Sequence, residues 1–260
     1  MALLALGVGT LKLKDRFLAQ HPEKFVAAGR EALDRKDYSA ARDNLLHAAA
    51  LSHPDAPLDV LIGDALNGLA SKDPDNVAAA RGMWEQALTV DPLNEQAMQR
   101  LTQFWRDQLE LHPRPSDRAQ AASNLQKAAE KLMHADPSNH FAQVNDAEAT
   151  VEMMLDGMQM DAQVSQDAED LLLKLAADDP ADAEIPYYAA RGYYWQAQQA
   201  SRFDDSTSQA ANTARAEKIM DDAVKIQPAN AAMHYRYGKL LLYIAAGKMA
   251  NAQEKEKPPQ

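Results

Sequence analysis

A proline returns at a regular interval along this chain, each time at the end of an apolar helical stretch and directly after a polar residue. The recurring prolines are Pro54, Pro92, Pro137, Pro180 and Pro228. Neighbours in this series are 38, 45, 43 and 48 residues apart. A period of roughly 20 to 50 residues is typical of solenoids, in which each unit buries its apolar face only against its neighbours. The proline period therefore predicts a repeat array rather than one deep globular core.

The composition favours helices over strands. Glycine occurs only 10 times and aromatic residues make up 6% of the chain, while Ala, Leu, Gln, Asp and Glu are abundant. No segment alternates β-branched and polar residues with a period of two, as a half-buried strand would. We therefore expect an all-α fold.

The charge and the absence of cysteine exclude several classes of function. With 27 Lys and Arg against 38 Asp and Glu, the net charge is −11. An acidic chain is repelled by phosphate backbones, so we expect no nucleic-acid partner. Without cysteine, the chain can form no disulfide, no thiolate metal site and no thiol nucleophile.

The clearest unit consists of two amphipathic helices that begin at Glu23 and Tyr38. Small residues at Gly29, Ala41 and Ala48 allow the two helices to approach closely, and Leu45 fills the space between neighbouring pairs. The following proline ends the unit because it cannot continue the helical hydrogen-bond ladder.

These residues resemble the tetratricopeptide repeat (TPR) family, whose units carry a small residue in the first helix and an alanine, bulky residue, alanine and proline series in the second. The residues that carry the resemblance are Gly29, Tyr38, Ala41, Leu45, Ala48 and His53-Pro54, then Ala80, Trp84, Ala87 and Asp91-Pro92, then Ala216, Met220, Ala223 and Gln227-Pro228, with Tyr237, Gly238 and Leu241 in the last helix. The resemblance implies a right-handed superhelical solenoid of antiparallel helix pairs, with about five units and a final capping helix over residues 22–247. It is weaker over residues 115–176.

Several local features are expected within this array. Turns between the helices of a unit are predicted near Ser71–Asn76, Pro113–Asp117, Asp156–Asp161 and Phe203–Ser208, where Pro, Asp, Asn and Ser favour turns and helix starts. Ala223 and Gly238 are expected at close helix–helix contacts.

The two ends of the chain differ from the array. Residues 1–21 open with an apolar segment that is too short to cross a bilayer by itself. Two interpretations remain open: a leader or capping helix that packs on the first unit, or the remnant of a membrane anchor. Residues 248–260 are predicted to be a disordered charged tail. A cytoplasmic location is expected, with membrane anchoring through the N-terminal segment of a bacterial protein as the alternative.

No catalytic or metal-binding motif occurs in the chain, so we expect neither enzyme activity nor a cofactor. His134 and His140 lie six positions apart around a repeat-ending proline, and Asp pairs occur at repeat ends. Both patterns are explained by repeat ends and helix starts without a metal.

The first helices of the last two units carry the candidate binding residues. In the TPR family, the first helices line a concave groove, and the resemblance places Tyr187, Arg191, Tyr194, Tyr235 and Lys239 in it. We expect Arg191 and Lys239 to be exposed cations that attract an acidic or C-terminal peptide segment, while the tyrosine rings contact its apolar side chains. The alternative is that the tyrosines pack between neighbouring helices.

The function implied is a non-catalytic protein–protein interaction scaffold that binds an extended peptide or a partner helix. A membrane-tethered assembly factor and a regulatory domain of an enzyme system are the alternatives. The methionines Met153, Met154, Met158 and Met160 form a second candidate contact surface, or else fill an irregular part of the core. Val26 and Arg30 replace the Lys and Asn with which one TPR sub-type clamps a carboxylate, so that clamp is not expected.

Overall fold

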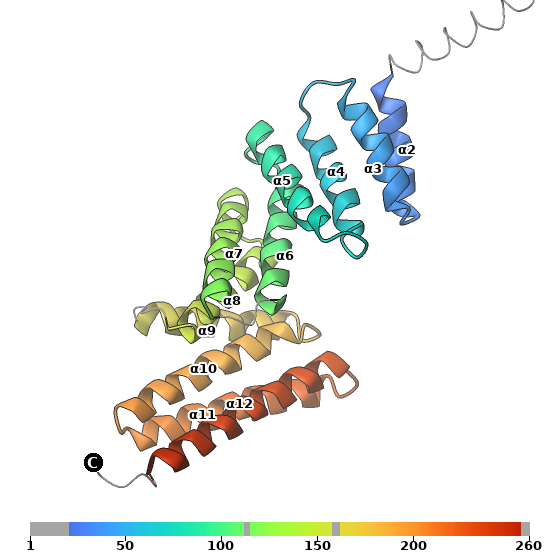
Figure 1. Ribbon diagram of the computed structural model, residues 1–260. Helices are drawn as coiled ribbons and strands as arrows, with labels where there is room; N and C mark the ends of the chain where they lie inside the picture. Colours follow the sequence, from blue (N-terminus) through green and yellow to red (C-terminus); the bar gives the residue numbers. More distant parts are fainter. Residues whose placement is uncertain (1–20, 112–114, 158–161, 256–260) are drawn as a thin grey trace, which may run out of the picture. The chain divides into compact units, whose positions relative to one another are not determined.

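The computed structural model describes residues 21–111, 115–157 and 162–255, and within these ranges the secondary structure is entirely helical (Figure 1). Eleven helices are described: α2 (Pro22–Asp34), α3 (Tyr38–Ala49), α4 (Ala56–Gly68), α5 (Asp75–Val90), α6 (Glu95–Leu111), α7 (Pro115–Ala135), α8 (His140–Leu155), α9 (Ala162–Asp178), α10 (Glu184–Arg202), α11 (Ser206–Ile226) and α12 (Ala231–Lys255). The chain divides into two compact units, unit 1 before and unit 2 after the boundary between Phe104 and Trp105 in α6.

The proline turns between helix pairs also start the next helix. In the turn before α6, Asp91 accepts a hydrogen bond from the backbone N–H of Leu93, and Asn94 accepts one from the N–H of Ala97. Asn139 and Asn230 cap α8 and α12 in the same way. Each side chain satisfies a backbone donor that the first turn of a helix leaves unpaired.

The turns between the two helices of one repeat are built in a different way. Lys36 and Asp204 adopt positive φ angles of 59° and 58°, which ends the preceding helix, and the next residue then caps the following helix. Asp37 accepts a hydrogen bond from Ala40 N–H at 3.2 Å, and Asp205 accepts one from Ser208 N–H at 3.0 Å. The turns predicted near residues 71–76 and 203–208 are confirmed.

In unit 1, neighbouring helices meet through small residues that receive large apolar ones. α2 packs on α3, α3 on α4, and α4 on α5. A Cβ atom at Gly29 of α2 would overlap the side chain of Leu45 in α3, and one at Gly63 of α4 would overlap the indole of Trp84 in α5. The predicted close approach at Gly29 is therefore confirmed.

In unit 2, the helices stack in the same sequential manner. α7 packs on α8, α8 on α9, α9 on α10 and α10 on α11, and α10 also contacts the alternate helices α8 and α12. In Figure 1, α10, α11 and α12 lie side by side in orange to red. α8 and α10 are buried along most of their length, which places them at the centre of this unit.

Three local expectations have different outcomes. Ala223 packs against the core of unit 2 as expected. The expectation for Gly238 is wrong, because a Cβ atom there would meet nothing within 4 Å. The last helix is longer than predicted: disorder was expected from Lys248, whereas α12 continues to Lys255.

Most of the N-terminal segment, residues 1–20, lies outside the described residues, as do residues 256–260.

Candidate functional site

Three cations of unit 2 gather around one tyrosine ring. The ring centre of Tyr187, on α10, lies 5.4 Å from the guanidinium carbon of Arg191, on the same helix. Arg236 and Lys239 of α12 approach the same ring at 5.2 Å and 5.7 Å. Cations at this distance are attracted by the electron density of an aromatic face. The structure thus brings together Tyr187, Arg191 and Lys239 of the predicted site, and adds Arg236.

The two arginines of this cluster are buried and bonded to carboxylates. Arg191, which is 7% exposed, donates hydrogen bonds to Glu152 of α8, and Arg236 donates to Glu184 of α10. The expectation that Arg191 is an exposed cation is therefore wrong. Lys239 is only partly buried, so it is the most accessible cation of the three.

Burial determines the protonation states at this cluster. Burial raises the pKa of the Tyr187 hydroxyl, and this oxygen is buried without a hydrogen-bond partner in the described part of the chain. For Arg191, burial acts to lower the pKa, but the carboxylate of Glu152 together with Tyr187 and Tyr188 more than offsets it, and the pKa is raised. Tyr187 stays neutral and Arg191 stays charged over the whole working range of pH.

Tyr187 itself packs between helices, as the alternative interpretation of the tyrosines requires. Its side chain is fully buried, and its ring lies edge-on to that of Tyr188 with 5.4 Å between the ring centres. The cluster nevertheless reaches the surface through Tyr243 of α12, which is 39% exposed and whose ring lies 5.8 Å from the guanidinium of Arg191.

Further ion pairs extend from this cluster along α8. Arg106 of α6 donates to Glu148 at 2.7 Å, and Arg118 of α7 donates to Asp156 at 2.5 Å. Burial raises the pKa of Glu148 to about 8, although Arg106 acts in the opposite direction. Acidic side chains spaced by four residues along α8 and at the residue that follows it thus each hold an arginine from a different helix. Sequence reasoning missed these carboxylates; their spacing was a visible signal, but such a series usually marks a solvated face.

Tyr194 and Tyr235, the other two predicted residues, lie elsewhere. Tyr194 donates a hydrogen bond from its hydroxyl to the backbone carbonyl of Tyr243 at 2.8 Å and lines a cavity between α10, α11 and α12. Tyr235 projects from α12 and is 65% exposed, although its ring centre is 5.9 Å from the guanidinium of Arg236.

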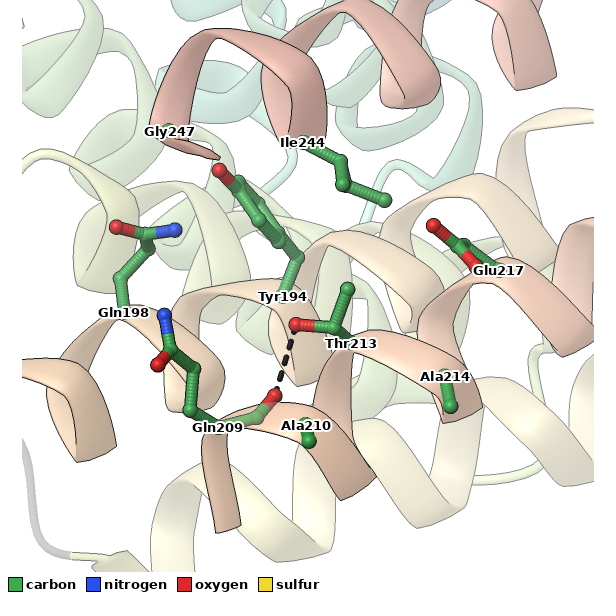
Figure 2. A pocket seen from close by; sticks show the side chains of 9 residues that line it. All are labelled: Tyr194, Gln198, Gln209, Ala210, Thr213, Ala214, Glu217, Ile244 and Gly247. Carbon is green, nitrogen blue, oxygen red and sulfur yellow. Dashed lines mark hydrogen bonds between the residues drawn. The ribbon is translucent and has the colours of Figure 1, made fainter. Parts of the chain in front are cut away.

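The cavity beside Tyr194 has a volume of about 410 Å³. Its lining combines polar and apolar groups: Tyr194, Gln198, Gln209, Ala210, Thr213, Ala214, Glu217, Ile244 and Gly247. Figure 2 shows the amides of Gln198 and Gln209 at one side and Glu217 with Ile244 at the other. Gly247 allows this arrangement, because a Cβ atom there would collide with the hydroxyl of Tyr194.

The methionine cluster is core in its described half. Met153 and Met154 are buried, so they are unavailable to a partner, whereas Met158 and Met160 lie outside the described residues. The described residues contain no group of three His, Asp or Glu side chains arranged to hold a metal ion. No helix within the described ranges is both long and apolar enough to span a membrane.

The helix pairs and their stacking define an all-α repeat protein of the solenoid class. Solved structures identify the fold as that of tetratricopeptide-repeat proteins. A TPR protein from Parabacteroides merdae superposes with a TM-score of 0.60 at 12% identity, over 93% of this chain and 82% of that one. YrrB, described as a TPR protein with an unusual peptide-binding site, gives 0.55 at 14% identity, over 81% of this chain and 89% of that one.

A double mutant of MamA RS-1 gives a TM-score of 0.53 at 14% identity, covering 78% of this chain and 96% of that one. At these identities the similarity is one of fold. No family model matches the sequence, and neither does any curated protein.

Proposed function

We propose that the protein is a non-catalytic scaffold that binds an extended acidic peptide segment at the face formed by α10 and α12. The observation that carries this proposal is the gathering of Arg191, Arg236 and Lys239 around the ring of Tyr187. Glu152 and Glu184 pair with two of these cations, so Lys239, the most accessible of the three, is the one that would attract a carboxylate in this acidic protein of net charge −11. The TPR fold, which in YrrB is described with a peptide-binding site, is consistent with this role.

The residues of the cluster have separate tasks in this proposal. Arg191 and Arg236 are paired with Glu152 and Glu184, so they hold α8, α10 and α12 in register rather than contact the peptide. Lys239 is the more accessible cation and would meet a side-chain or C-terminal carboxylate. The half-exposed ring of Tyr243 beside it offers apolar contact area with little loss of side-chain entropy.

Selection from a displayed library of peptides with free C-termini, followed by fluorescence anisotropy, tests this site. We expect Lys239→Glu to lower the affinity for a selected acidic peptide by about tenfold or more at low salt, and by less at high salt. Lys225→Glu is the matched control, because Lys225 is an exposed lysine on α11. A selected peptide that binds wild type and Lys239→Glu equally at every salt concentration would place the binding site elsewhere.

A further inference from the structure

The last helix carries apolar side chains on two opposite faces. Met233, Leu240 and Ile244 are buried against the rest of unit 2. On the other side, Tyr235 is 65% and Leu242 is 72% exposed, and the alanines one turn beyond each of them are exposed as well. A helix that is apolar on both faces is normally covered on both, and a continuous apolar patch marks an interaction site.

A glycine lies in the middle of this outer face. Gly238 is flanked by Tyr235 on one turn and Leu242 on the next, and a Cβ atom there would meet nothing within 4 Å. At Gly29 and Gly63, by contrast, the neighbouring helix places a large side chain directly over the glycine. Gly238 is therefore placed like the glycines at helix–helix contacts, but in the described part of the chain no side chain packs over it.

We propose that this outer face of α12 binds the same face of a second copy of the chain, with the two helices antiparallel. The two-fold axis passes between Gly238 and Lys239. In this register Tyr235 lies against Leu242 of the partner subunit, and the exposed alanines at the two ends of the face meet each other. Gly238 beside the axis allows close approach, and a large residue on each side fills the gap, so the face is complementary to itself.

Up to Gly247, the outer face of α12 carries no acidic side chain that would oppose this occupant. Two copies with a net charge of −11 repel each other over most of their surface. From Ala231 to Gly247, however, α12 contains no Asp or Glu, and its ionic side chains Arg236 and Lys239 lie towards Tyr187 rather than on the outer face. A contact through one helix pair is at the small end of specific interfaces, below about 1,200 Å² in total, so the dimer is expected to be weak and reversible.

Disulfide trapping tests the pairing, because the chain has no cysteine of its own. Gly238→Cys places a single thiol beside the proposed axis, where the two Cα atoms fall within the roughly 7 Å that a disulfide can bridge. We expect mild oxidation of the full chain to yield a covalent dimer. Gly82→Cys is the matched control, since Gly82 is also an exposed helical glycine with nothing near its Cβ position, and it should stay monomeric.

A second disulfide experiment tests the antiparallel register. A mixture of Tyr235→Cys and Leu242→Cys chains should form the mixed disulfide in preference to either symmetric one, whereas a parallel pair would give the symmetric products. In sedimentation equilibrium, Leu242→Asp should lower the association constant by about tenfold or more. Phe203→Asp, at a residue that is 81% exposed outside this face, should leave it unchanged.

Equal trapping of the Gly238→Cys and Gly82→Cys chains would overturn the proposal. A wild-type chain that remains monomeric at the highest concentration reached would also overturn the proposal, because a second copy of the chain would then not bind the outer face.

Discussion

The contact between α4 and α5 in unit 1 is made by a glycine and a tryptophan, whereas the contact between α8 and α10 in unit 2 contains a glutamate paired with an arginine. In the described part of unit 1, Asp59 is the one buried residue that ionises as an acid or a base. Unit 2 buries three glutamates and two arginines: Glu148, Glu152, Glu169, Arg191 and Arg236. The described core of unit 1 is therefore almost purely apolar, whereas in unit 2 buried ion pairs lie beside the apolar core.

This difference coincides with the weakest part of the repeat pattern. The resemblance to the TPR pattern is poorest over residues 115–176, which include α8 and most of α9, and these two helices carry the three buried glutamates. Removing charges from water costs several kcal/mol per ion, so a buried pair seldom adds net stability. Each pair joins two helices next to the proposed peptide site, and we expect it to fix their register rather than to add stability.

The largest difference between the units is expected when one partner of an ion pair is removed. Arg191→Ala leaves the carboxylate of Glu152 buried and unpaired, and should lower the free energy of unfolding by about 3–5 kcal/mol. Arg100→Ala removes an equally well-formed pair with Asp64 in unit 1, but Arg100 is half exposed, and the loss should be about 0–1 kcal/mol. Urea unfolding followed by circular dichroism measures both.

The double change Arg191→Met with Glu152→Leu separates charge from packing. If burial of an unpaired charge causes the loss, the double variant should recover most or all of the stability. A double variant as unstable as Arg191→Ala would show that the shapes of the two side chains, rather than their charges, hold α8 against α10.

A smaller effect is expected at the glycine contacts of unit 1. Gly63→Ala places a methyl group against the indole of Trp84 and should destabilise by about 1–3 kcal/mol through overpacking. Gly82→Ala, in the interior of α5 with open space around it, should instead stabilise by up to about 1 kcal/mol because alanine favours the helix. Opposite signs in thermal melts of the two variants are the expected result, and the same sign would contradict the contact geometry of unit 1.

The last comparison concerns the pH dependence of unit 2, where the effect grows with pH instead of being a fixed loss. Burial raises the pKa of Glu169 to about 8, above the 4.5 of an ordinary glutamate, so the folded chain binds a proton that the unfolded chain has released. The resulting stability is fully present below about pH 4.5 and is lost as the pH rises towards 8, by at most about 1.4 kcal/mol per pH unit. Glu169→Gln should flatten this slope.

Hydrogen exchange measured on peptides from α9 and α10 reports unit 2 separately from unit 1. Exchange in these helices should become faster relative to the intrinsic rate between pH 5 and 8 in the wild type, and less so in Glu169→Gln. Peptides from α2 and α3 serve as the internal control, because those helices contain no buried acid. Equal slopes in both chains would mean that Glu169 is already ionised when folded.

The sequence by itself determined the class of fold and, at the two confirmed turns between helices of one repeat, where the helices end. These features depend on signals that act within a few residues: the proline that ends a pair, the Asn two residues later that caps the next helix, and the spacing of Gly29, Ala41 and Leu45 along helix faces. Such local signals can be interpreted without knowledge of any distant partner, which is why the positions of the turns could be predicted.

The tertiary structure alone decided what the predicted site residues do. Arg191 appeared as an exposed groove cation because nothing near it in the sequence could neutralise it; its partner, Glu152, is 39 positions away. Glu184 and Arg236 are 52 positions apart, and Gly238 differs from Gly29 only in the absence of a helix against it among the described residues. Whether a charge is paired or a glycine is covered depends on which helices the fold brings together, and no local pattern carries that information.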